Sequence, residues 1–174
     1  MKYLIVDDMP EHIAPLITNL REAGHQVTNT RNLSMGWEEI NRAHRARTPF
    51  DLIVLDLALD RKVREFPEEQ KVIRDALYSR SVADIPVSGQ AMGLRLWRRR
   101  KEIQQRYCYI TYHQYVWMAQ LDGEDPEFEQ ELSELDVGWL PKLILEKSDL
   151  WPDNVAEKFE TAYKIWEERK WLVD

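Results

Sequence analysis

Four short apolar segments punctuate the chain, and each is rich in β-branched or aromatic residues. They span residues 3–6, 52–55, 107–111 and 143–145. Their near-continuous apolar character predicts buried parallel strands, because strands covered on both faces lose the alternation of half-exposed ones. A weaker strand is expected at residues 26–30.

Helical patterns separate these strands. In residues 10–23, apolar side chains recur at a spacing that places them on one face, and Gly24 follows as a stop signal. Pro15 requires this helix either to begin late or to kink. Further helices are expected at residues 34–45, 91–105 and 155–171. The alternation of strand and helix predicts a doubly wound α/β sheet, in which sites lie at the carboxyl ends of the strands.

Two segments lie outside this simple scheme, at about residues 59–90 and 122–138. The first contains an amphipathic pattern that we expect to form a helix ended by Pro86 and Gly89. The second is strongly acidic. Both are interpreted as surface insertions in a single domain spanning residues 1–174, with no separate output domain.

Composition and charge narrow the classes of protein. A chain of 174 residues with 44% hydrophobic residues suits one compact core. The formal net charge of −7 argues against direct nucleic-acid binding, which usually requires a basic excess. The single cysteine, Cys108, excludes an internal disulfide, and neither a signal peptide nor a membrane-spanning segment can be drawn. A cytoplasmic protein without membrane contact is therefore expected.

Polar side chains follow four of the predicted strands. They are Asp7 and Asp8 after the first, Asp56 after the third, Thr111 at the end of the fourth, and Lys147 after the fifth. The carboxyl ends of parallel strands share one edge of the sheet, so these groups should gather there. Taken alone, a pair of aspartates after a strand more often caps a helix than binds a metal. The shared placement of all five favours a site.

The chemistry of this cluster points to phosphoryl transfer. Crowded carboxylates repel one another, and a hard cation such as Mg²⁺ relieves that repulsion. The ammonium of Lys147 would offset the charge of an incoming phosphoryl group, and the Thr111 hydroxyl would donate to one of its oxygens. Asp56 is the candidate nucleophile, because carboxylates can form acyl phosphates.

At this point the chain resembles the receiver domain of two-component response regulators, the CheY-like domains. The matching sequence segments are Leu4-Ile5-Val6-Asp7-Asp8, Asp51-Leu52-Ile53-Val54-Leu55-Asp56-Leu57, Tyr109-Ile110-Thr111 and Leu143-Ile144-Leu145-Glu146-Lys147. The resemblance implies a flavodoxin-like fold, with a five-stranded parallel sheet of order 2-1-3-4-5 and helices on both faces. It covers most of the chain and leaves out the two insertions.

The resemblance also implies roles for individual residues. Asp56 would accept a phosphoryl group from a histidine kinase or phosphotransfer protein, and Thr111 and Lys147 would engage the phosphoryl oxygens. The Mg²⁺ ligands would be Asp8, Asp56, the backbone carbonyl of Ala58 and, mostly through water, Asp7. The output would pass to a downstream protein by direct interaction, with a homodimer through the last strand and helix as a further option.

Several positions depart from the usual receiver pattern. Ile144 stands where the family usually has an aromatic switch residue, and Ser148 stands where proline usually follows the lysine. Tyr112 replaces a small residue and could narrow access to Asp56. His113 occupies a place that tunes loss of the phosphoryl group in the family. These departures motivate a second hypothesis, a pseudo-receiver that binds partners without phosphorylation.

A phosphatase with an aspartyl-phosphate intermediate is a third, lower-ranked hypothesis, because such enzymes have Asp-x-Asp with the nucleophile first. Here Met9 follows Asp7-Asp8. The chain is accordingly expected to be a phosphoacceptor with at most self-phosphorylation and self-dephosphorylation chemistry, and not an enzyme.

Two other features are interpreted structurally. The basic run at residues 98–101 is expected to be a solvated helix end, with a docking patch as the alternative. The tryptophans near the last helix are expected to be core, with a protein interface as the alternative. They are Trp151, Trp166 and Trp171.

Overall fold

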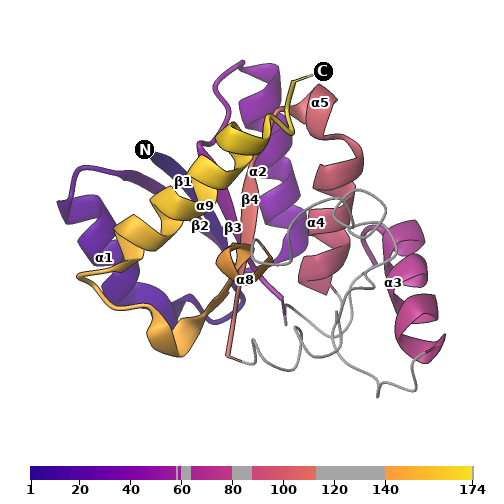
Figure 1. Ribbon diagram of the computed structural model, residues 1–174, viewed down its shortest axis with the longest axis horizontal. Helices are drawn as coiled ribbons and strands as arrows, with labels where there is room; N and C mark the ends of the chain where they lie inside the picture. Colours follow the sequence, from indigo (N-terminus) through magenta and orange to yellow (C-terminus); the bar gives the residue numbers. More distant parts are fainter. Residues whose placement is uncertain (58, 60–63, 80–87, 113–139, 174) are drawn as a thin grey trace.

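A single parallel sheet with the strand order β2-β1-β3-β4-β5 forms the centre of the molecule (Figure 1). The computed structural model describes residues 1–57, 59, 64–79, 88–112 and 140–173. The strands are β1 (Lys2–Val6), β2 (Gln26–Thr30), β3 (Leu52–Asp56), β4 (Tyr107–Thr111) and β5 (Ile144–Glu146). The predicted fold class and strand order are confirmed, and β2 and β4 have the predicted bounds.

Helices cover both faces of this sheet. α1 contacts α9 and α2 contacts α4, so that two helix pairs enclose the strands between them (Figure 1). The longer helices are α1 (Ala14–Glu22), α2 (Leu33–Arg45), α3 (Pro67–Ser79), α4 (Ser88–Arg98) and α9 (Val155–Arg169). Short helical turns are η1 (Pro10–Ile13), α5 (Arg100–Ile103), α8 (Leu140–Leu143) and η2 (Lys147–Asp149). Among the described residues, no helix combines the length and apolarity that crossing a membrane requires.

Pro15 determines where the first helix begins. The segment from Pro10 to Ile13 is a 3₁₀ turn, and the α-helix begins only at Ala14. Pro15 therefore lies in the first helical turn, where the missing N–H has no intrahelical partner to lose. Gly24, with φ of 86°, follows the helix and adopts the left-handed conformation that glycine tolerates best.

The segment between β3 and β4 differs from the prediction in one important respect. The expected amphipathic helix exists as α3, with Ile73 buried and Val72 packed against the core. Gly89 was expected to follow α3 as a terminator but instead lies in the first turn of α4. α4 contacts β3 and β4, whereas α3 packs on α4 at the periphery of the molecule (Figure 1). α3 is therefore the added helix, and α4 covers the sheet. The predicted insertion at residues 122–138 lies outside the described residues.

The basic run at residues 98–101 is not simply solvated. Arg98 pairs with Glu69 of α3 at 3.3 Å, and Arg99 pairs with Glu102. The guanidinium carbon of Arg100 lies 4.1 Å from the centroid of a Trp97 ring. These contacts hold Arg98, Arg99 and Arg100 against other side chains. The expected 91–105 helix is divided into α4 and α5.

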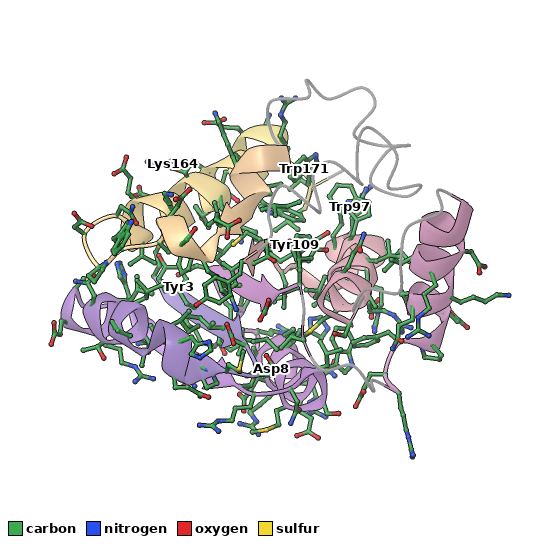
Figure 2. All side chains as sticks on the ribbon, turned by 90° about the horizontal axis from the view of Figure 1, so that it is seen from below. Tyr3, Asp8, Trp97, Tyr109, Lys164 and Trp171 are labelled. Atoms are coloured by element: carbon green, nitrogen blue, oxygen red, sulfur yellow. The ribbon has the colours of Figure 1, made fainter. Side chains whose placement is uncertain are left out.

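Aromatic side chains fill the region between α4 and α9. Trp166 is 1% exposed and contacts the rings of Trp97, Trp171 and Tyr107. Figure 2 labels Trp97 and Trp171 close together, in agreement with their ring separation of 5.3 Å. The core interpretation is therefore right for Trp166. It is wrong for Trp151, which lies in the segment before α9 and is 61% exposed.

Alkaline pH is expected to destabilise the protein through Tyr3. Burial, with a smaller contribution from Asp51, raises the pKa of Tyr3 from 10.0 to about 12. The pKa of Tyr3 is higher in the folded state than in the unfolded state. The stabilising contribution of this shift to the free energy of unfolding is therefore complete below pH 10.0 and disappears as the pH rises toward about 12. Urea unfolding across that pH range measures the decline in the free energy of unfolding. In Tyr3→Phe this free energy should decline less steeply with pH. An equally steep decline in Tyr3→Phe would contradict the assignment.

Candidate functional site

The strand register brings three carboxylates to one edge of the sheet. Val6 of β1 pairs with Leu55 of β3, so that the residues after them, Asp7 and Asp56, are neighbours. The Asp7 N–H donates to the Thr30 carbonyl at 3.0 Å and thereby extends the β1–β2 ladder by one residue. Figure 2 shows the molecule from below the view of Figure 1, looking onto this edge, and labels Asp8. The predicted convergence of strand ends is what places these groups together.

The cluster is compact and largely buried. Oxygen atoms of Asp7, Asp8 and Asp56 lie within 4.8 Å of one another. Lys147 Nζ lies 2.8 Å from Asp7 Oδ2 and 2.7 Å from Asp56 Oδ2. Asp7 is 1% exposed, Asp56 is 5% exposed and Lys147 is 7% exposed. The ammonium therefore bridges two carboxylates in a site with little solvent.

Burial and the two carboxylates act oppositely on Lys147. Burial by itself lowers the pKa of this ammonium, because the charged form loses hydration. The charges of Asp56 and Asp7, together with their hydrogen bonds, outweigh burial and leave the pKa of Lys147 above its ordinary value. Lys147 consequently stays charged and holds Asp56 in a fixed orientation.

Asp7 and Asp8 have different environments although they are adjacent. The Met9 N–H donates to Asp7 Oδ1 at 2.8 Å, which fixes the Asp7 side chain. Asp8 is the more exposed carboxylate of the three. Within the described part of the chain, neither a hydrogen bond nor an ion pair engages its side chain. Asp8 thus offers oxygen atoms on the solvent side of the cluster.

Thr111 and Tyr112 complete this edge of the sheet. Thr111 is the last residue of β4 and is 1% exposed. The Tyr112 ring is half-exposed, with its centroid 5.1 Å from Lys147 Nζ. The same ring meets His12 of η1 edge to face at 6.3 Å. The Tyr112 ring therefore lies beside Lys147, and the narrowing of access to Asp56 stays a prediction. Ala58 and His113 lie outside the described residues.

The positions that depart from the receiver pattern lie in and after β5. Ile144 begins this strand and is 1% exposed, within the hydrophobic core. Ser148 is exposed in η2, the 3₁₀ turn that Lys147 begins. The backbone therefore brings Lys147 to the cluster without the proline that usually follows it.

Two neighbours of the cluster were not found from the sequence. Gly89 lies against the backbone of Asp56, and His12 lies against Tyr112. Gly89 is 33 positions after Asp56 in the chain, and glycine is common at helix ends, so its spacing gave no signal. His12 was one of four dispersed histidines, and only the turn of η1 brings it near Tyr112.

The donor set fits a divalent cation. Three carboxylates against one ammonium leave local negative charge, and carboxylate oxygens are the ligands that Mg²⁺ prefers. Asp8 provides the accessible oxygen atoms, and Asp7 and Asp56 provide the buried ones. Asp7, Asp8 and Asp56 are therefore compatible with Mg²⁺ binding.

Comparison with solved structures identifies the architecture. A sensor protein from Polaromonas sp. JS666 superposes with a TM-score of 0.57 at 11% identity, covering 94% of this chain and 96% of that one. A response regulator receiver domain protein from Clostridium thermocellum gives a TM-score of 0.51 at 11% identity, covering 97% and 98%. The chain has the fold of a response-regulator receiver domain. A response regulator from Thermotoga maritima, at 12% identity and a TM-score of 0.50, covers 94% of this chain and 97% of its own.

The receiver fold is shared at very low sequence identity. No model of a known protein family matches the chain, and no curated protein matches it. The likeness to these receiver structures therefore concerns the backbone and the order of its strands. What the site does must be argued from its own residues.

Proposed function

We propose that this protein is a response-regulator receiver that accepts a phosphoryl group on Asp56 in a phosphorelay. The observation that carries the proposal is the buried ion pair of Lys147 with Asp56, beside the accessible carboxylate of Asp8. A solely structural ion pair would need one carboxylate. Three clustered carboxylates, two of them paired with one ammonium, lie at the edge where α/β sheets carry their sites, and they indicate binding of a cation and an anion together.

The residues divide the chemistry among them. An Asp56 carboxylate oxygen attacks the phosphorus of a phosphohistidine, a P–O bond forms, and the P–N bond breaks with its electron pair leaving on the imidazole nitrogen. Lys147 Nζ, already 2.7 Å from Asp56 Oδ2, stabilises the charge of the phosphoryl oxygens. Thr111 provides a hydroxyl donor at the same edge. Mg²⁺ held by Asp7, Asp8 and Asp56 would neutralise charge on the carboxylates and the phosphoryl group.

The partners follow from this chemistry. The donor would be a histidine kinase or a phosphotransfer protein, and the output would pass to a downstream protein target. The protein would retain its phosphoryl group or lose it by self-dephosphorylation, without turnover of an exogenous phosphomonoester. Multiple turnover on such a substrate would favour the phosphatase hypothesis instead.

Incubation with Mg²⁺ and a small phosphodonor such as acetyl phosphate tests the proposal. Intact-mass spectrometry should show one added phosphoryl group that is absent in Asp56→Asn and absent when EDTA replaces Mg²⁺. Glu146→Gln, next to the cluster in sequence, is the matched control and should be phosphorylated like the native protein. If the native protein gains no acyl phosphate, the proposal fails.

A phosphorylation-independent binding module is the second candidate. It is favoured by the Tyr112 ring, which stands over Lys147, and by Ile144, which is buried where an aromatic switch would act. A comparison of partner affinity between the native protein and Asp56→Asn, with and without phosphodonor, separates the two functions. Equal affinities throughout would favour this second candidate.

A further inference from the structure

The first turn of α4 lies directly on the backbone of the proposed phosphoacceptor. A Cβ atom built on Gly89 would lie 2.8 Å from the carbonyl carbon of Asp56 and 3.0 Å from Leu57 Cα, and closer still to the Asp56 carbonyl oxygen. Backbone atoms cannot rotate away as a side chain can. Only glycine therefore allows α4 and the end of β3 to lie at their present separation.

Helix formation does not explain this glycine. Gly89 lies in the first turn of α4, where a helix accepts other residues and gains nothing from the absence of a side chain. Ser88 and Gln90, on either side of Gly89, are also buried, at 3% and 5% exposure. This whole turn is packed against the end of β3, and its distance from Asp56 is set by the missing side chain.

Ion pairs in turn connect α4 to the added helix α3. Glu69 of α3 is 2% exposed and accepts hydrogen bonds from Arg95 Nε at 2.6 Å and from Arg95 Nη2 at 2.8 Å. Arg98 adds a third contact at 3.3 Å, and the Arg95 guanidinium lies over the Phe66 ring at 5.2 Å. A two-point carboxylate–guanidinium pair fixes orientation as well as distance. The Glu69–Arg95 pair therefore fixes how α3 is oriented against α4.

We propose that Gly89 is a positioning residue for Asp56, and that α4 transmits changes at Asp56 to α3 through the Glu69–Arg95 pair. The path consists of the Asp56 backbone, Gly89, α4 and Glu69. This inference rests on the proposed phosphoryl acceptance at Asp56. The path leads to α3, a helix outside the simple five-unit scheme, and does not pass through Ile144. α3 is therefore the surface that responds to phosphorylation.

The positioning role is tested with two glycines of the same helix. Gly89→Ala should weaken Mg²⁺-dependent beryllofluoride binding by about 10- to 100-fold, because small displacements of a reacting group have effects of this size. Gly93→Ala is the matched control, because its Cβ would crowd the Tyr109 ring, 2.6 Å from Cζ, and not the Asp56 backbone. Its binding should change less than about 2-fold.

Both alanine variants can lose stability, so binding is measured by calorimetry at a temperature where circular dichroism shows each to be folded. If either variant fails to fold, both are measured at lower temperature in a stabilising osmolyte such as sucrose. Equal weakening in both variants, or no weakening in Gly89→Ala, would overturn the positioning role.

Transmission to α3 is tested by hydrogen exchange of peptides covering residues 67–79. Beryllofluoride with Mg²⁺ should change exchange in α3 of the native protein. Glu69→Gln should abolish that change while leaving beryllofluoride binding intact. Binding without any response in α3 would overturn the inference and leave the proposed function standing. Absence of binding to the native protein would remove the proposed function, and the inference with it.

Discussion

Lys147→Met is expected to destabilise the metal-free protein by about 3–5 kcal/mol, the usual cost of removing one partner from a buried ion pair. The variant leaves Asp7 and Asp56 together, both almost without solvent and without the ammonium that bridges them. Methionine fills a similar volume, so that the loss is electrostatic and not a cavity effect. Urea unfolding in EDTA measures the change in the free energy of unfolding.

The effect of Mg²⁺ on the stability of Lys147→Met links the loss of stability to the carboxylate cluster. Adding Mg²⁺ should recover part of the lost stability, because a cation that binds only the folded state stabilises it by mass action. Lys71→Met, on the exposed face of α3, is the control and should change stability by no more than about 0.5 kcal/mol. A Lys147→Met variant as stable as the native protein in EDTA would contradict the buried-pair description.

Trp166→Ala is expected to cost about 3–5 kcal/mol of unfolding free energy, as for other large aromatic residues removed from a core. The ring packs among Trp97, Trp171 and Tyr107, and its Nε1 donates to the Tyr107 carbonyl at 2.8 Å. The variant would leave a cavity and would remove the hydrogen bond to the Tyr107 carbonyl. Urea or thermal unfolding followed by far-ultraviolet circular dichroism measures the loss.

Trp151→Ala provides the matched control for this prediction. Trp151 is 61% exposed, and the hydrogen bond that it makes to Asn154 uses its backbone N–H, which alanine retains. Its removal should change the unfolding free energy by no more than about 0.5 kcal/mol. Comparable losses in the two variants would contradict the assignment of Trp166, and not Trp151, to the core.

The sheet could be predicted from the sequence because most of its buried parallel strands are nearly continuous apolar runs that alternate with helical patterns. β4 is apolar at almost every position and is buried on both faces, so its bounds were correct. The predicted strand at residues 143–145 was shifted by one residue, because Leu143 ends the short helix α8 and Glu146 ends β5. An apolar run marks burial, and it does not distinguish the last residue of a helix from the first of a strand.

The candidate site was predictable to the extent that it is made at strand ends. Asp7, Asp56 and Lys147 meet because parallel strands expose their carboxyl ends at one edge. Gly89 was not predictable, because its role depends on the distance between α4 and β3, which no local pattern records. The same is true of Arg98, whose partner Glu69 lies on another helix.

A structure determined with Mg²⁺ and beryllofluoride tests the central claim most directly. The account predicts beryllofluoride on an Asp56 oxygen, Mg²⁺ among Asp7, Asp8 and Asp56, and Lys147 Nζ moved from its pair with the carboxylates onto a fluoride. Density for the metal alone, or for neither group, with the Lys147–Asp56 pair unchanged at 2.7 Å, would contradict phosphoryl acceptance at Asp56.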